Sequence, residues 1–237
     1  ELVHVEGGYA HPIGDRWTPW RMEYSRLNAG DVYPTHSIGP VCRLLDIHRT
    51  DRLHYLIAMQ TNAFKGAEMY QEVMGKACDS FANGDQTSTM IRTVKGKTML
   101  NQHNVMTPRP YSRMFQAVGT AGYAAKYPVS EVQLSPEMAA KVGIEMEDNK
   151  LPLNASQIET LLNYYAPSFP SETIALAKEL DARGGMSYFM DLRLAQCLQQ
   201  GLPLDMDVYD LAEWCCIAEL SKRSIEQGSM PVMIPDF

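Results

Sequence analysis

The sequence lacks long hydrophobic runs, internal repeats and low-complexity tracts. No apolar stretch approaches the roughly eighteen residues that a membrane-spanning helix needs, which argues against a membrane partner. The chain has only five cysteines, and none shows the C-x-x-C spacing that is typical of zinc sites. An odd number of scattered cysteines also argues against a disulfide framework. We therefore expect no structural metal and no stabilising disulfides.

Several common functional motifs are also missing. The chain contains no G-x-S-x-G, no H-E-x-x-H, no P-loop and no G-x-G-x-x-G dinucleotide fingerprint. Its 28 acidic and 21 basic residues give a net charge of −7, which argues against nucleic acid as a partner. The chain opens abruptly in a strand-like run, Leu2–Val5, so we expect it to be a fragment or a processed product.

The first half of the 237 residues is dominated by strand patterns. An alternating run predicts a strand over residues 2–6 that ends at Gly7-Gly8. Glycines at this point favour either a close backbone approach to a ligand or a simple turn beside surface aromatics. Further strands are predicted over residues 53–59, 88–94 and 98–105, and a hairpin over residues 114–127 turns near Gly119 and Gly122.

The second half is dominated by helix patterns. Asn154 with Gln157 forms a capping-box pattern, and Asp207 caps the last long helix. Other helices are predicted after Ser135, over residues 171–183, and over residues 186–200 with Met190, Leu194 and Cys197 on one face. Strands followed by helices predict a single α+β domain with a largely antiparallel, open sheet and helices covering one face.

One stretch of the first half combines reactive side chains with a helix start. Tyr33, Thr35 and His36 stand directly before an apolar stripe with helical spacing. Ser37 is predicted to be the N-cap and Pro40 to lie in the first helical turn. The three side chains are then expected near a helix N-terminus, where free N–H groups favour electron-rich oxygens. A buried turn with a hydrogen-bonded histidine is the alternative.

Aromatic and basic residues gather in three clusters near strand ends, where binding sites are often built. Together they offer phenols, imidazoles and guanidinium groups but few carboxylates. This mixture suits a neutral, hydroxylated ligand such as a sugar, and it fits poorly with a glycosidase that uses paired carboxylates. The clusters are Tyr9 with His11; Arg21 with Tyr33, Thr35 and His36; and Arg109 with Tyr111.

Five segments, in order along the chain, look like motifs of glycoside hydrolase family 109. The segments are Gly7–His11 with Trp20-Arg21, Tyr33–His36 followed by Gly39-Pro40, Pro108–Arg113, Gly201–Asp210 and Ile234–Phe237. These relatives are NAD-dependent glycosidases, typified by α-N-acetylgalactosaminidase, of the Gfo/Idh/MocA oxidoreductase superfamily. The resemblance covers only the family's C-terminal domain, so residues 1–237 are expected to be one substrate-binding and oligomerisation domain. The Rossmann domain that binds most of the NAD is absent from the chain.

The resemblance also implies roles for individual residues. In the family mechanism, NAD oxidises the sugar at C3, a base removes the C2 proton, the glycosidic oxygen leaves, water adds, and the hydride returns. Tyr33 or Tyr9, together with His36, would then transfer protons. The substrate would be bound by Tyr9, His11, Arg21, Tyr33, Pro34, Thr35, His36 and Tyr111.

The sequence departs from the family pattern at two positions, and two alternative functions remain open. Ser37 and Ser187 stand where relatives often carry other residues, which puts the preference for N-acetylgalactosamine in doubt. The alternatives to a glycosidase are a sugar dehydrogenase or reductase of the same superfamily, and a non-catalytic carbohydrate-binding or oligomerisation module. Homo-oligomers are expected from analogy with the superfamily.

Overall fold

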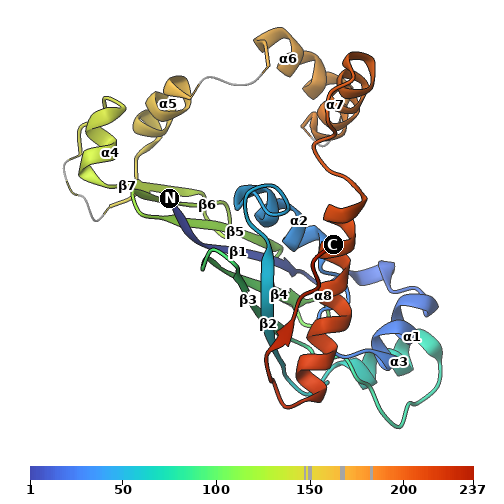
Figure 1. The fold of residues 1–237 in the computed structure, drawn as a ribbon. Helices are drawn as coiled ribbons and strands as arrows, with labels where there is room; N and C mark the ends of the chain where they lie inside the picture. Colours follow the sequence, from blue (N-terminus) through green and yellow to red (C-terminus); the bar gives the residue numbers. More distant parts are fainter. Residues whose placement is uncertain (147, 149–150, 166–168, 182–183) are drawn as a thin grey trace.

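A computed structural model describes residues 1–146, 148, 151–165, 169–181 and 184–237 (Figure 1). The strands are β1 Leu2–Ala10, β2 Leu53–Gln60, β3 Thr87–Thr93, β4 Thr98–Asn104, β5 Ser112–Gly119, β6 Gly122–Ala125, β7 Glu131–Leu134 and β8 Val232–Met233. The helices are α1 Pro19–Leu27, α2 Thr35–Leu44, α3 Gly66–Met74, α4 Pro136–Lys141, α5 Ala155–Tyr164, α6 Ser171–Leu180, α7 Met186–Gln200 and α8 Val208–Glu226, with a 3-10 turn, η1, at Gly14–Arg16.

The strands form one eight-stranded sheet in the order β7-β6-β5-β1-β4-β3-β2-β8. All neighbours are antiparallel except β1 and β4, which run parallel with Val5 opposite Met99. This arrangement confirms the predicted α+β class with its largely antiparallel sheet. The predicted strands over residues 53–59, 88–94 and 98–105 and the predicted hairpin over residues 114–127 are also confirmed.

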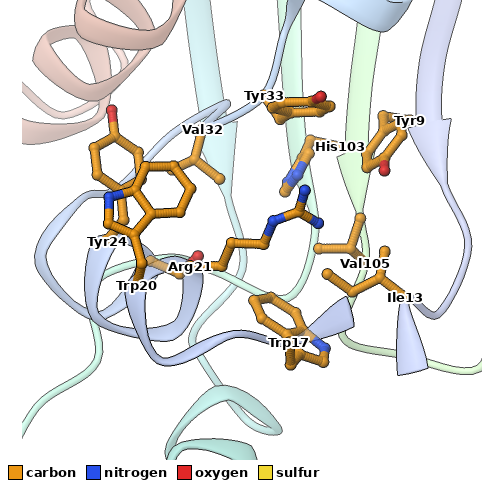
Figure 2. Close-up of a pocket in the computed structure, with 11 residues that line it drawn as sticks. Tyr9, Ile13, Trp17, Trp20, Arg21, Tyr24, Val32, Tyr33, His103 and Val105 are labelled. Carbon is orange, nitrogen blue, oxygen red and sulfur yellow. The ribbon is translucent and has the colours of Figure 1, made fainter. Parts of the chain in front are cut away.

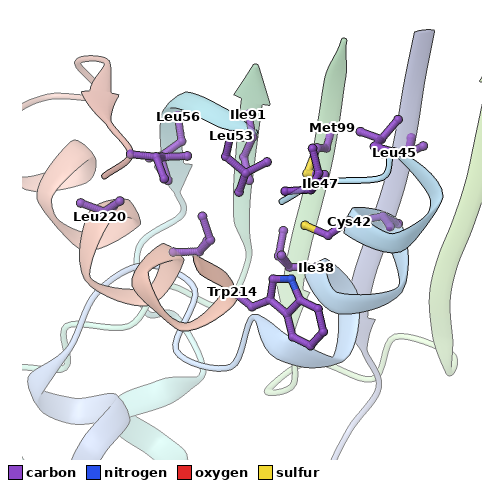
Figure 3. Close-up of a cluster of buried hydrophobic side chains, with 14 of the residues drawn as sticks. Ile38, Cys42, Leu45, Ile47, Leu53, Leu56, Ile91, Met99, Trp214 and Leu220 are labelled. Atoms are coloured by element: carbon purple, nitrogen blue, oxygen red, sulfur yellow. The ribbon is translucent and has the colours of Figure 1, made fainter. Parts of the chain in front are cut away.

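The main core lies between the sheet and two helices, α2 and α8, which cover the same face (Figures 1 and 3). Leu56, Ile91 and Met99 point from the sheet into this layer, where they meet Ile38 of α2 and Ile217 of α8. The two helices also pack on each other. A Cβ at Gly39 would lie 3.2 Å from the Trp214 ring, so the missing side chain allows the indole to sit against α2.

The Gly7-Gly8 pair does not end β1, contrary to the prediction, because the strand continues to Ala10. The space beside the two glycines is filled by the chain itself rather than left open for a ligand. A Cβ at Gly7 would lie 2.9 Å from the Ser37 carbonyl oxygen, and one at Gly8 would lie 3.0 Å from the Met114 sulfur. The glycines therefore allow α2 and β5 to approach β1 closely.

The start of α2 lies three residues before the predicted one. The helix begins at Thr35 with Pro34 as its N-cap, so Ser37 is not the cap. The Ser37 hydroxyl instead donates to the Pro34 carbonyl oxygen at 2.9 Å. Pro40 consequently lies inside the helix rather than in its first turn, and it has no N–H to donate to the carbonyl of His36. Tyr33 and His36 do flank the N-terminus of α2, as predicted.

Helices α5, α6 and α7 form an arm outside the layer made by the sheet, α2 and α8 (Figure 1). The arm buries little apolar surface: Ala177 is the buried residue of α6 and Cys197 that of α7. Met190 and Leu194 share a face of α7 with Cys197, as predicted, but both are exposed. The capping boxes at Asn154 and Asp207 are confirmed. The helix predicted over residues 171–183 ends earlier, at Leu180, because Asp181 has an extended backbone; residues 182 and 183 lie outside the described residues.

Helices α1 and α3 are not among the elements predicted from the sequence. The Thr18 hydroxyl caps α1, and Pro19 occupies its first turn. In the described part of the chain, no helix combines the length and the apolar character needed to cross a membrane.

Two neighbouring leucines at the end of α2 test the importance of the core. Leu45 is 1% exposed and Leu44 is 51% exposed. We expect Leu45→Ala to lower the free energy of unfolding by about 2–5 kcal/mol, because it removes buried methyl groups and leaves a cavity. Leu44→Ala is the matched control and should change it by less than about 0.5 kcal/mol. Urea unfolding of both variants measures the difference, and equal effects would contradict this description of the core.

Candidate functional site

The ring of Tyr9 is the centre of an aromatic cluster at the end of β1. Ring centroids of His11, Tyr33 and His36 lie 4.9, 5.1 and 5.2 Å from that of Tyr9. The ring of His103, on β4, stacks against it at 6.0 Å. The cluster thus joins β1, β4 and the start of α2, which the close approach at Gly7 brings together.

On one side of the cluster lies a small aromatic pocket (Figure 2). Its volume is about 70 Å³, well below that of sites that hold drug-sized ligands. Arg21 extends from α1 into this pocket, and its guanidinium group points toward Tyr33, His103 and Tyr9 (Figure 2). The aromatic pocket is lined by Tyr9, Ile13, Trp17, Trp20, Arg21, Tyr24, Ser25, Val32, Tyr33, His103 and Val105.

On the other side lies a larger opening, which we call the basic groove. Its volume of about 900 Å³ is within the range of small-molecule sites. Its described lining contains three cationic residues and no Asp or Glu. The basic groove is lined by His11, Pro12, Ile13, Gly14, Arg16, Thr35, His36, Pro40, Tyr111, Arg113, Phe115, Lys126, Tyr127 and Met186.

The structure brings most of the predicted site residues together around these two cavities. Tyr9, Arg21 and Tyr33 line the aromatic pocket, whereas His11, Thr35, His36 and Tyr111 line the basic groove. Two of the predicted residues have structural positions instead. Pro34 forms the N-cap of α2, and Arg109 donates hydrogen bonds to the side-chain oxygens of Gln86 and Gln102.

Four residues near the cavities were missed from the sequence: His103, Arg113, Arg16 and Lys126. For two of them, His103 and Arg113, the sequence carries a feature that could have drawn attention to the residue. His103 occupies a buried position of the β4 alternation, where a polar residue is unusual. Arg113 belongs to the quoted segment Pro108–Arg113, but nothing in its spacing indicated that it reaches Tyr9.

The guanidinium group of Arg113 stacks on two tyrosines. Its Cζ atom lies 4.3 Å from the Tyr9 ring centroid and 5.1 Å from that of Tyr111. Its Nε donates to the Tyr111 hydroxyl at 3.1 Å. The following residues, Met114 and Phe115, have positive φ angles of 59° and 48°, and the pairing of β1 with β5 shifts register there. This bulge bends β5 beside the site.

Two histidines are held in the neutral form. Burial, the positive charge of Arg113 and the nearby His11 together lower the pKa of His36. Burial alone lowers the pKa of His103 to about 4, and its Nδ1 atom is buried with no partner among the described residues. A neutral imidazole is able to accept a proton near pH 7, so His36 is suited to be a base.

Asp31 fixes the loop that carries Tyr33. Its carboxylate accepts the Tyr33 backbone N–H at 3.1 Å and a hydrogen bond from the Asn101 side chain. Its own backbone N–H donates to the Ser221 hydroxyl of α8 at 2.9 Å. The side chain is buried, and burial raises the pKa of Asp31 to about 7. This carboxylate therefore fixes the loop that carries Tyr33, and it lines neither cavity.

The arrangement suits proton transfer at a hydroxylated ligand. It provides phenols, a neutral imidazole and hydrogen-bond donors, and the described groove lining provides no carboxylate pair for direct glycoside hydrolysis. In the described part of the chain, no group of three or more His, Cys, Asp or Glu residues is arranged to hold a metal ion.

Comparisons with known proteins agree on one family. Residues 14–237 match the family model described as glycosyl hydrolase 109, C-terminal domain. The chain is 50% identical over 246 residues to glycosyl hydrolase family 109 protein 1 of Bacteroides fragilis (strain YCH46) and 51% identical over 245 residues to that of Bacteroides thetaiotaomicron. All of this chain is covered in both cases, but only 53% and 52% of the relatives, so it spans about half their length.

Solved structures share the fold at low identity. A levoglucosan dehydrogenase in complex with NADH and L-sorbose matches all of this chain and 59% of its own, with a TM-score of 0.61 at 15% identity. The same enzyme in complex with NADH and levoglucosan matches with a TM-score of 0.59. These matches confirm the resemblance of the fold to Gfo/Idh/MocA dehydrogenases.

The buried carboxyl of Asp31 predicts a pH-dependent stability. Its pKa is about 7 in the folded chain and about 4 when unfolded, so between these values the folded chain binds one proton more. Its contribution to the free energy of unfolding should therefore fall by roughly 1 kcal/mol per pH unit from about pH 4 to 7. Asp31→Asn keeps an acceptor for the Tyr33 N–H without the titration.

The stability of Asp31→Asn relative to wild type should accordingly rise across this pH range in urea unfolding. The exposed Asp15→Asn is the control, and its unfolding curves should run parallel to those of wild type. If the free energy of unfolding of Asp31→Asn also varies with pH in parallel with that of wild type, the raised pKa of Asp31 is contradicted.

Proposed function

The chain belongs to the glycosyl hydrolase 109 C-terminal domain family, and from that membership we propose that it is the substrate-binding domain of an NAD-dependent glycosidase. We further propose that a Rossmann domain binding most of the NAD lies in the other half of the full-length protein. The coverage of about half of each relative supports this division, as does the missing dinucleotide fingerprint.

One observation carries the proposal. Tyr9, Tyr33 and the neutral His36 are packed together beside a groove whose described lining has no carboxylate. Direct hydrolysis of a glycoside requires paired carboxylates, whereas elimination next to a carbonyl requires a base and hydrogen-bond donors. The side chains present fit the second chemistry.

The groove also has room for the cofactor. At about 900 Å³ it is large enough to admit a sugar ring together with a nicotinamide ring. His36, Thr35 and Tyr111 would lie along them. When bound, NAD supplies the reversible oxidation of the sugar at C3 that acidifies the proton at C2.

The residues of this chain would then handle the protons. The neutral imidazole of His36, with the hydroxyl of Tyr33 or Tyr9, takes the C2 proton and later returns one as water adds. Arg21 and Tyr111 hold sugar hydroxyls from the two sides of the cluster. Arg113 fixes the Tyr111 hydroxyl through its Nε hydrogen bond.

A second candidate is a sugar dehydrogenase or reductase without glycosidic cleavage. It is supported by the fold shared with the levoglucosan dehydrogenase. A non-catalytic carbohydrate-binding module would use the same groove without proton transfer. The three functions differ in their products, so one assay distinguishes them.

That assay uses the full-length protein with aryl α- and β-glycosides and no added NAD, in D₂O. Release of aglycone, with deuterium at C2 of the released sugar, is expected because the C2 proton exchanges with solvent during elimination. Release without deuterium would indicate direct hydrolysis and contradict the mechanism. In a parallel reaction with added NAD, formation of NADH with no release from any glycoside would indicate a dehydrogenase instead.

Substitutions test the assigned proton-transfer residues. We expect His36→Ala and Tyr33→Phe to reduce the rate of C2 deuterium incorporation about 10²–10⁴-fold in the full-length protein, the usual contribution of general acid–base catalysis. His54→Ala and Tyr165→Phe replace the same residue types outside both cavities and serve as controls. Unchanged exchange in the first two variants would remove these residues from the mechanism.

We also propose that the protein forms a homo-oligomer through the face of the sheet opposite α2 and α8. Ile57, Met90 and Leu100 are cross-strand neighbours on β2, β3 and β4. Ile57 and Met90 are 36% and 45% exposed. Adjacent exposed apolar side chains on a sheet face favour association.

Light scattering of the full-length protein tests this surface. Wild type should be a dimer or larger, and Met90→Glu should shift it toward the monomer because the interface would bury an unpaired charge. Met206→Glu, also at an exposed methionine, should leave the mass unchanged. A monomeric wild type would refute the proposal.

A further inference from the structure

The basic groove has a charge that is unusual for this chain. Arg16, Arg113 and Lys126 line it, and its described lining has no acidic residue, although the whole chain carries a net charge of −7. None of the ion pairs within the described residues involves these three side chains. Three unpaired cations at one opening attract an anion and strengthen its binding.

Arg113 in particular has an unused hydrogen-bond donor. Its Nε is bonded to the Tyr111 hydroxyl, but Nη1 is buried and has no partner among the described residues. A guanidinium group carries five N–H donors in a fixed fork that matches the two oxygens of a carboxylate or phosphate. A buried donor without an acceptor is costly, so an anionic oxygen from a ligand would stabilise this arrangement.

The three cations come from different parts of the chain. Arg16 lies in η1, Arg113 in β5, and Lys126 directly after β6. Arg16 and Lys126 are exposed, whereas Arg113 is partly buried between Tyr9 and Tyr111. A ligand at Tyr111 and His36 would therefore meet Arg113 first and could extend toward the other two cations.

We propose that the basic groove binds an anionic group of the ligand, with Arg113 as its main partner and Arg16 and Lys126 as further contacts. This inference rests on the proposed function, since it places a substrate in the same groove. The contact of Arg113 with two predicted sugar-binding tyrosines favours a carboxylate or sulfate on the sugar. The diphosphate of NAD offers the same chemistry and is the other source to be tested.

Equilibrium binding to the full-length protein tests the proposal without any turnover. Calorimetry compares D-galacturonate with D-galactose and D-glucuronate with D-glucose, and it measures NAD separately. At least one acidic sugar should bind about tenfold more tightly than its neutral counterpart, as one charge-assisted hydrogen bond would give. This preference should shrink when NaCl is raised from about 50 to about 500 mM.

Variants identify the source of the anion. Arg113→Gln and the double variant Arg16→Gln/Lys126→Gln should lose the preference for the acidic sugar, while the exposed Arg223→Gln on α8 should retain it. If the variants instead lose about tenfold in NAD affinity without any change in sugar binding, the groove binds the cofactor's diphosphate.

The proposal would be overturned by a wild type that shows no preference for acidic sugars, combined with variants whose NAD affinity equals that of wild type. The double variant replaces exposed side chains only, so it remains informative if Arg113→Gln fails to fold. Because no step requires turnover, a failure here is distinguishable from a failure of the glycosidase assay.

Discussion

The site depends on one close contact between a helix and a strand. At Gly7 the backbone of β1 lies against the Ser37 carbonyl of α2, with no space for a side chain between them. This approach brings His36 to within 5.2 Å of the Tyr9 ring, from a different element of the chain. Since α2 is also held by Trp214 against Gly39, the position of His36 is tied to the core as well as to the sheet.

Much of the fold and part of the site could be predicted from the sequence, because both rest on local signals. Runs of strand-favouring residues identified β2, β3 and β4, and side-chain caps identified α5 and α8. Motif resemblance identified Tyr9 and His36, which the structure places together. The N-cap of α2 was misassigned because Ser37 is a better capping residue than Pro34, yet the helix begins at Thr35 and Pro34 caps it without a side-chain hydrogen bond.

The remainder could not be predicted, since it arises from contacts between distant segments. Arg113 reaches Tyr9 across a bulge in β5, and a register shift of this kind leaves no periodic pattern in the sequence. Arg16 and Lys126 reach one groove from two separate turns. The basic character of the groove is therefore a property of the folded chain, and it stands against the acidic composition as a whole.

The central place of β1 in the sheet has a consequence for how the protein folds. His4 on β1 bonds to Thr98 on β4, 94 residues along the chain, and β1 pairs with β5 further on still. Contacts between such distant residues slow folding, because the intervening loop must close first. During synthesis, Tyr9 and His11 leave the ribosome long before their later partners His103, Tyr111 and Arg113 exist. The site therefore assembles late, only after the chain has been made through β5.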